Sequence, residues 1–103
     1  MTEMFTHPTR EELELSAVLH ALSDPVRLTM VRRLATGELS CGGIDVPVTK
    51  STCTHHFKVL REAGVIRQRQ EGRARLNTLR TEDLEARFPG VLDAILGAAA
   101  VTP

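Results

Sequence analysis

Residues 51 to 62 carry side chains whose chemistry suits binding to a nucleic acid. On a helix that turns about 100° per residue, Ser51, Thr54, His55, Lys58 and Glu62 share one outward face. Hydroxyl groups can bond to several base edges, a threonine methyl can contact thymine, and a lysine neutralises phosphate. The alternative is an ordinary solvated helix face, so this pattern needs support from its neighbours.

A second set of cationic side chains follows directly. Arg67 and Arg69 precede a turn expected at residues 70–73, and Arg73 and Arg75 occupy its end and the run after it, with Glu71 as the single acid. Guanidinium groups on a short ribbon suit phosphate oxygens and a narrow minor groove. A charged edge hairpin that resists aggregation is the alternative. Together with the helix before it, the hairpin favours DNA binding.

The net charge of zero conceals a strong segregation of charge. Residues 24–80 hold eleven basic and five acidic residues, whereas residues 1–23 and 81–103 each hold one basic and four acidic residues. A localised positive field attracts a polyanion whatever the total charge of the chain. The basic middle of the chain therefore indicates a nucleic-acid partner.

Helical periodicity and breaks in it define the elements that must position these residues. Asp24 and Pro25 suit the N-cap and first position of a helix, Thr49 suits another N-cap, and glycines suit helix ends. The expected elements are helices at 10–22 and 25–36, a short third helix within 38–48, a helix at 50–63, a hairpin at 65–80, and helices from 81 and from 91, separated by Pro89 and Gly90.

This order predicts a mainly α fold with a small β-hairpin wing, which is a winged helix-turn-helix. One domain fits 103 residues. The expected boundaries are a flexible tail at 1–9, a domain at 10–97 and a frayed end at 98–103, with the helix-turn-helix at about 38–64, the wing at about 65–80 and a dimerisation helix at about 81–97.

Two motifs in the chain resemble those of the ArsR-type (ArsR/SmtB) winged-helix repressors of bacteria. The resemblance covers about residues 21–79 and rests on Asp24-Pro25-x-Arg27 and on the block STxTHHFKVLREAG from Ser51 to Gly64. It implies a homodimer, dimerising through its first and last helices, that binds double-stranded DNA at an inverted-repeat operator and leaves when an inducer is sensed. With the residue chemistry above, the expected DNA-binding residues are Lys50, Ser51, Thr52, Thr54, His55, Lys58, Arg69, Arg73 and Arg75.

The dimer implied by the resemblance agrees with the apolar pattern of the terminal helices. Helix 10–22 is apolar on two sides and so needs two partners, of which one could be a second subunit. The expected dimerisation residues are Leu13, Ala17, Leu92, Ile95 and Leu96. His56 lies beside the inward stripe of its helix, and we expect it to be packed or hydrogen-bonded.

Neither metal site common in the family can be built from this sequence. Ser40 and Gly42 occupy the positions of the Cys-x-Cys ligands, and residues 81–103 contain no histidine for a site on the last helix. His7, His20 and Cys41 could in principle bind a metal, but their spacing along the sequence is not that of a metal-binding motif. The sequence predicts no metal and no cofactor, with a metal-responsive repressor using a non-standard site as an alternative.

Two thiols are the remaining candidates for signal sensing. Cys53 lies on the inward side of helix 50–63, in the first turn, where the helix dipole favours thiolate, and Cys41 lies in the segment expected to pack across it. Our hypothesis is that oxidation joins Cys41 to Cys53, or modifies one of them, and weakens DNA binding. The alternative is two small buried hydrophobes.

Other classes of function have less support. The sequence has no acid/base pair, nucleophile-base arrangement or phosphate-cradling loop, so we expect no enzymatic activity. It has no apolar run near the roughly 20 residues of a membrane span, and no signal-peptide pattern, which predicts a cytoplasmic protein without membrane contact. The resemblance implies a bacterial, nucleoid-associated protein. The main rival is a winged-helix module that binds an acidic protein. The inducer, the operator and the choice between repression and activation stay open.

Overall fold

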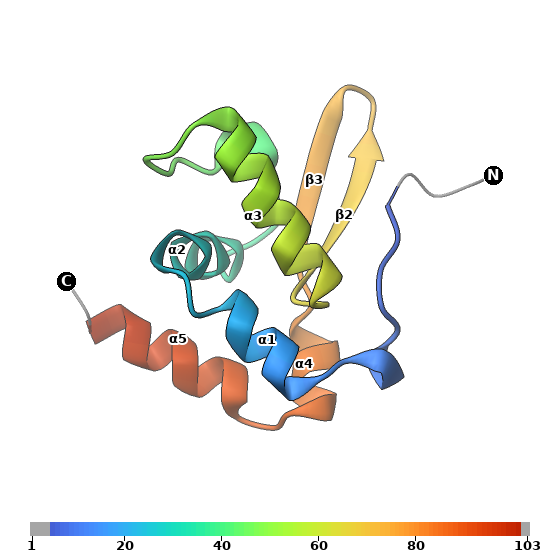
Figure 1. Ribbon diagram of the computed structural model, residues 1–103, viewed down its shortest axis with the longest axis vertical. Helices are drawn as coiled ribbons and strands as arrows, with labels where there is room; N and C mark the ends of the chain where they lie inside the picture. The colour runs from blue at the N-terminus through green and yellow to red at the C-terminus, as the bar shows by residue number, and fades with distance from the viewer. Residues whose placement is uncertain (1–4, 102–103) are drawn as a thin grey trace.

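The computed structural model describes residues 5–101 and contains helices around a small antiparallel sheet (Figure 1). The 3-10 helices are η1 (Arg10–Glu12) and η2 (Cys41–Gly43). The α-helices are α1 (Leu15–Ala21), α2 (Pro25–Leu34), α3 (Lys50–Glu62), α4 (Thr81–Arg87) and α5 (Val91–Val101). The strands are β1 (Leu39–Ser40), β2 (Ile66–Glu71) and β3 (Ala74–Leu79).

Helix α2 begins where the sequence predicts. The Asp24 carboxylate accepts hydrogen bonds from the backbone N–H groups of Val26 (2.9 Å) and Arg27 (3.0 Å), and Pro25 is the first helical residue. These bonds occupy two donors that have no partner inside the helix. The backbone hydrogen bond from Arg27 is the main reason that the pKa of Asp24 lies below its ordinary value.

We expect the Asp24→Ala substitution to lower the free energy of unfolding by about 1 kcal/mol at pH 7, because the cap is lost. Since the pKa of Asp24 is depressed in the folded state, the stabilisation is complete above the unfolded pKa of about 3.9 and is lost as the pH falls through the lower folded pKa. Urea denaturation of both proteins between pH 7 and pH 3 measures this difference. Asp24→Asn, an uncharged cap, is the control; an Asp24→Ala deficit that stayed constant to pH 3 would contradict the account.

The first expected helix, at 10–22, is interrupted. Leu13 and Glu14 are extended between η1 and α1, so the prediction of one continuous helix is wrong. The interruption turns the Leu13 side chain into the core, where it is 1% exposed, and its carbonyl accepts a 2.8 Å hydrogen bond from Arg87. Gly64 has a φ of +82° and packs against Leu13 so closely that a Cβ would collide with it. Leu13 therefore joins the N-terminal segment to the end of α3.

The third expected helix is also absent as an α-helix. Residues 38–48 form β1, the single turn η2 and a loop. Gly42 and Gly43 give little helical stability, and Pro47 ends any continuation. The first element of the helix-turn-helix is therefore reduced, and β1 joins the edge of the sheet, which has the order β1-β3-β2.

The hairpin has the expected position and a two-residue turn. Strands β2 and β3 pair from Ile66 with Leu79 to Glu71 with Ala74, and the turn contains Gly72 with a φ of +60°. Alternation along each strand puts Gln68 and Asn77 on the buried face and Arg67 and Arg69 on the opposite face. We call the β2–β3 hairpin the wing.

The two ends of the described chain pack more closely than a tail and a frayed end would. Phe5 is buried at 8% exposure, and the Pro8 carbonyl accepts a 2.7 Å hydrogen bond from Arg80. At the other end α5 continues to Val101. The flexible tail at 1–9 and the frayed end at 98–103 stay predictions; residues 1–4 and 102–103 lie outside the described residues.

The core confirms the winged-helix architecture. Buried side chains from α1, α2, α3, the wing and the last two helices form one cluster, which includes Val18, Met30, Leu60, Ile66 and Leu92. Helices α1 and α5 lie on the side of the molecule opposite the tip of the wing (Figure 1). Within residues 5–101, no helix is long and apolar enough to cross a membrane.

Candidate nucleic-acid interface

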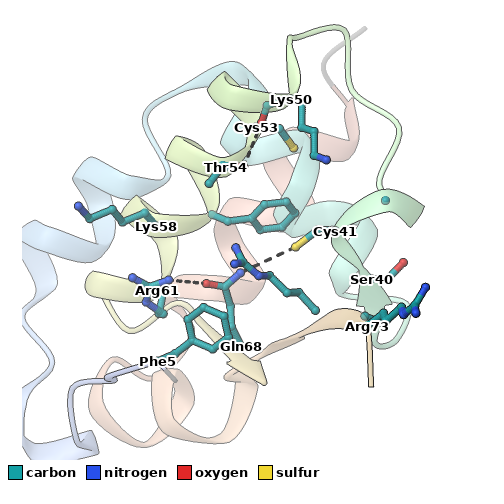
Figure 2. A pocket seen from close by; sticks show the side chains of 14 residues that line it. Phe5, Ser40, Cys41, Lys50, Cys53, Thr54, Lys58, Arg61, Gln68 and Arg73 are labelled. Atoms are coloured by element: carbon teal, nitrogen blue, oxygen red, sulfur yellow. Dashed lines mark hydrogen bonds between the residues drawn. The ribbon is translucent and has the colours of Figure 1, made fainter. Parts of the chain in front are cut away.

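A groove of about 1010 Å³ lies between α3 and the wing (Figure 2). Its walls come from η2, α3 and both strands of the wing, and Phe5 of the N-terminal segment also lines it. The lining residues include five cationic side chains, and no described lining residue is acidic. These five are Lys50, Lys58, Arg61, Arg73 and Arg75. The groove is therefore a concentrated positive field.

The structure brings five of the nine expected DNA-binding residues into this groove, namely Lys50, Thr54, Lys58, Arg73 and Arg75. Lys50 and Thr54 lie in the first turns of α3, and the Thr54 hydroxyl donates a 3.0 Å hydrogen bond to the Lys50 carbonyl. Helix α3 starts here because Thr49 accepts a 3.2 Å hydrogen bond from the Thr52 N–H, as the sequence predicts.

Three more of the expected residues lie on α3 beside the groove. Ser51, Thr52 and His55 are exposed and do not line the groove. The Thr52 hydroxyl accepts a 2.9 Å hydrogen bond from Thr49 and keeps a proton to donate. These side chains form an exposed polar surface at the start of α3, with the groove cations next to it.

Arg69 does not line this groove, unlike the other arginines expected to bind DNA, Arg73 and Arg75. It lies on the opposite face of the wing and forms ion pairs with Glu38 and with Glu71, the latter at 3.0 Å. Its hydrogen bond to Glu38 is the main reason that the pKa of this carboxylate is lowered, and the Thr78 hydroxyl adds a 3.0 Å bond. Sequence spacing alone could not reveal Glu38, which lies 31 residues away.

A buried network of amides connects α3 to the wing and to Cys41. Arg61 donates to the Gln68 side-chain carbonyl at 2.7 Å, and Gln68 donates to the Asn77 carbonyl at 2.8 Å. Asn77, with 0% exposure, donates to the Leu39 carbonyl at 3.2 Å and to the Cys41 sulfur at 3.3 Å. In the sequence, only the polar residues at buried positions of the wing, Gln68 and Asn77, could have indicated this network. The sequence analysis did not identify them.

The two cysteines line the same groove from facing elements. Cys41 comes from η2 and Cys53 from α3, and both are half-buried (Figure 2). Burial raises the pKa of the Cys53 thiol, and the nearby Cys41 raises it further. Burial of the Cys53 thiol thus opposes the thiolate that the start of the helix favours.

The Asp24-Pro25-x-Arg27 motif connects the body of the domain to α3. Arg27 is 8% exposed, donates to the Ala21 carbonyl at 2.7 Å, and lies 3.1 Å from Nδ1 of His56. Because a guanidinium can only donate, His56 Nδ1 accepts this hydrogen bond. The prediction that His56 is packed and hydrogen-bonded is confirmed.

Metal ligands do not come together in the part of the chain that the structure describes. No group of three His, Cys, Asp or Glu side chains there could hold a metal ion. The Cys41 sulfur receives a hydrogen bond from the Asn77 amide, and the other described polar residues lining the groove near the thiols include no carboxylate or histidine.

A polar helix beside a cationic wing, on a three-stranded sheet with supporting helices, defines a winged-helix DNA-binding protein. Residues 22–69 match a family model described as a helix-turn-helix domain. The chain is 38% identical over 82 residues to the HTH-type transcriptional regulator YceK of Bacillus subtilis, covering 76% of this chain and 82% of that one. It is 34% identical over 87 residues to a biofilm growth-associated repressor of Agrobacterium fabrum, covering 82% and 74%.

Solved structures agree with these relatives. The transcriptional repressor BigR from Xylella fastidiosa has a TM-score of 0.60 and 28% identity, covering 72% of this chain and 85% of that one. A possible transcriptional regulator for arsenical resistance has a TM-score of 0.64 and 26% identity, covering 87% and 100%. The chain belongs to the ArsR-type family of winged helix-turn-helix transcriptional regulators, which are DNA-binding proteins and not enzymes.

Proposed function

We propose that the protein is a homodimeric repressor that binds an inverted-repeat operator in the bacterial cytoplasm and is released by a thiol signal. The observation that carries the proposal is the groove between α3 and the wing, whose cationic lining adjoins the polar start of α3. A relative named as a repressor supports repression. In this proposal the helix-turn-helix at about 38–64 and the wing at about 65–80 contact DNA.

The proposed contacts divide by chemistry. The cations of the groove bind phosphates and fix the position of the protein, while the polar side chains of α3 contact base edges. The phosphate-binding residues are Lys50, Lys58, Arg73 and Arg75. The base-contacting residues are Ser51, Thr52, Thr54 and His55.

The proposed dimer surface is formed by α1 and the C-terminal helices at about 81–97. Leu13 and Leu92, which we expected at the dimer surface, are buried in the core of the protomer at 1% and 4% exposure, so we do not include them in the proposed surface. Leu15 and Leu19 of α1 are instead exposed at 42% and 45%, although both are large and apolar. Ala17, Ile95 and Leu96 are half-buried and complete the surface.

We expect Leu19→Asp to convert the dimer into a monomer, because a carboxylate would be buried in an apolar interface. Sedimentation equilibrium of the wild-type and variant proteins measures the change, and circular dichroism checks that the variant folds. Ser16→Asp, at an exposed polar position of α1, is the control and should stay dimeric. A wild-type protein that sedimented as a monomer at all concentrations would contradict the dimer.

For the signal, we propose that oxidation at Cys41 and Cys53 weakens DNA binding. Both thiols line the groove in which DNA would bind, so a bond between them or an added group changes its shape. We expect peroxide to weaken operator binding by the wild-type protein and a reductant to restore it, measured by gel shift. The Cys41→Ser, Cys53→Ser double variant should bind DNA equally well with and without peroxide; if it still lost DNA, the thiol signal would be wrong.

A gel shift with DNA from upstream of the protein's own gene tests the function as a whole. Binding of that fragment in preference to unrelated DNA supports the proposal. The rival function, a winged-helix module for an acidic protein, predicts no retention of the fragment even at low salt.

A further inference from the structure

The groove combines two kinds of chemistry that DNA binding does not require together. Its lining includes the half-buried thiol of Cys41 and four cationic side chains, Arg73 and Arg75 of the wing and Lys50 and Lys58 of α3. Figure 2 shows Cys41 in the wall of this groove. A negatively charged molecule that enters the groove is attracted by these cations. A negatively charged electrophile would therefore be concentrated in the groove whose wall contains the sulfur.

Of the two thiols, Cys41 is better placed to react with such an electrophile. Its sulfur receives a hydrogen bond from the buried Asn77 amide at 3.3 Å and a longer one from Gln68 at 4.0 Å. Both amides are held in place by the network that continues to Arg61, so they keep their direction. The Cys41 sulfur is therefore held at a fixed position in the wall of the groove. Burial raises the pKa of the Cys53 thiol, which lowers the fraction of that thiol present as the reactive thiolate.

We propose that Cys41 is a site of S-thiolation by small anionic disulfides, meaning disulfides whose thiol halves carry carboxylate groups. The proposal deepens the proposed function, because it names the reacting cysteine and the chemical class of the signal. The modification itself requires only the groove, so it can be tested without DNA.

The reaction is a thiol–disulfide exchange. The Cys41 thiolate attacks one sulfur of the disulfide, a Cys41–S–S–R bond forms, and the S–S bond of the reagent breaks. The leaving thiolate takes the electron pair and a proton, so that one thiol of the protein is oxidised while one half of the reagent is released as R–SH. No other oxidant is needed, and excess thiol reverses the reaction.

The adduct would act on DNA binding through charge and volume. The group R would lie in the groove, and its carboxylates would face the cations that are proposed to bind phosphate. The adduct would occupy these cations and add negative charge, and both effects oppose the binding of DNA in the same groove. Modification of Cys41 and operator binding are thus expected to exclude each other.

The experiment measures the rate at which the free Cys41 thiol disappears. The reduced full-length protein is mixed with dithiodipropionate (anionic), cystamine (cationic) or bis(hydroxyethyl) disulfide (neutral), quenched with iodoacetamide and mapped by mass spectrometry. Each rate is divided by the rate of N-acetylcysteine amide with the same reagent. At low salt, we expect the normalised rate of the anionic reagent to exceed that of the cationic one about tenfold or more, and added salt to reduce this ratio.

Matched variants test whether the preference for the anionic reagent depends on the groove cations, and whether the reaction takes place at Cys41. Arg73→Ala with Arg75→Ala should reduce the ratio, whereas Arg32→Ala, on the exposed part of α2 and outside this groove, should not. In the Cys53→Ser protein, the anionic adduct should accumulate on Cys41. Serine at position 41 keeps a hydrogen-bond acceptor for Asn77, so Cys41→Ser should fold and leave Cys53 reacting at least about tenfold more slowly.

Equal normalised rates for the anionic and cationic reagents, or faster loss of Cys53 than of Cys41, would overturn the proposal. These results concern the thiol alone and leave the DNA-binding function standing. Conversely, a protein that showed the anionic preference at Cys41 but retained no DNA would keep the modification site and refute the proposed function. Gel shifts of the unmodified and thiolated protein then show whether the adduct releases DNA.

Discussion

Replacing Arg27 by alanine should lower the free energy of unfolding by about 3 kcal/mol, a large part of the stability of a small domain. The Arg27 side chain fills a buried position and donates hydrogen bonds to the carbonyls of Ala21 (2.7 Å) and His20 (3.4 Å) at the end of α1. It also holds Nδ1 of His56 on α3 at 3.1 Å. Alanine would leave these acceptors without their donors and open a cavity.

The control variant separates the charge of Arg27 from the directions of its hydrogen-bond donors. Arg27→Lys keeps the charge but not the planar set of donors, so it should recover less than half of the lost stability. Urea denaturation followed by circular dichroism measures both variants, and the exposed Arg32→Ala substitution on the same helix should change stability by less than about 0.5 kcal/mol. If Arg27→Ala were as mild as Arg32→Ala, the interpretation of the motif as a connection between α1, α2 and α3 would be wrong.

Removing the four groove cations that are proposed to bind phosphate should produce the largest change in DNA binding. Alanine at Lys50, Lys58, Arg73 and Arg75 together would delete eight cations from a dimer, and we expect operator affinity to fall at least about a thousandfold. The dependence on salt should weaken by about 0.9 in log–log slope for each phosphate that the variant no longer neutralises. Fluorescence anisotropy with labelled DNA, over a series of salt concentrations, measures both quantities.

Two comparison variants separate the effect of the groove charge from the effect of contacts that select the operator sequence. Arg69→Ala removes a cation that is paired with Glu38 and Glu71 on the far face of the wing, so it should change affinity by less than about threefold. Thr54→Ala with His55→Ala should reduce the preference for the operator over unrelated DNA and leave the salt slope nearly unchanged. A loss of affinity from Arg69→Ala equal to that from replacing a groove cation would contradict this placement of the interface.

Local signals made much of the fold predictable. Asp24 with Pro25, Thr49, Gly64 and the Pro89-Gly90 pair each act within a few residues, and the structure has helix boundaries at all of them. Their effects need no knowledge of the rest of the chain, because caps and breaks satisfy or remove neighbouring backbone groups. The order of elements, and with it the winged-helix class, followed from these boundaries.

Interactions between distant residues account for what the sequence did not reveal. Leu13 lies on an apolar face by periodicity, yet its burial against Gly64 requires a break in the helix. Arg69 has the chemistry of a DNA contact, but Glu38 on another element binds it. The amide network from Arg61 to Cys41 crosses four elements, so no spacing along one of them predicts it.

The most direct test of the central claim is a nuclease footprint of the purified protein on DNA from upstream of its own gene, made at low and at high salt. Binding through two copies of α3 and the wing predicts protection of an inverted repeat with half-sites about one helical turn apart. Affinity should fall about a thousandfold or more between about 50 and 200 mM salt. Absence of any protected sequence at low salt, with the protein folded and dimeric, would contradict the claim.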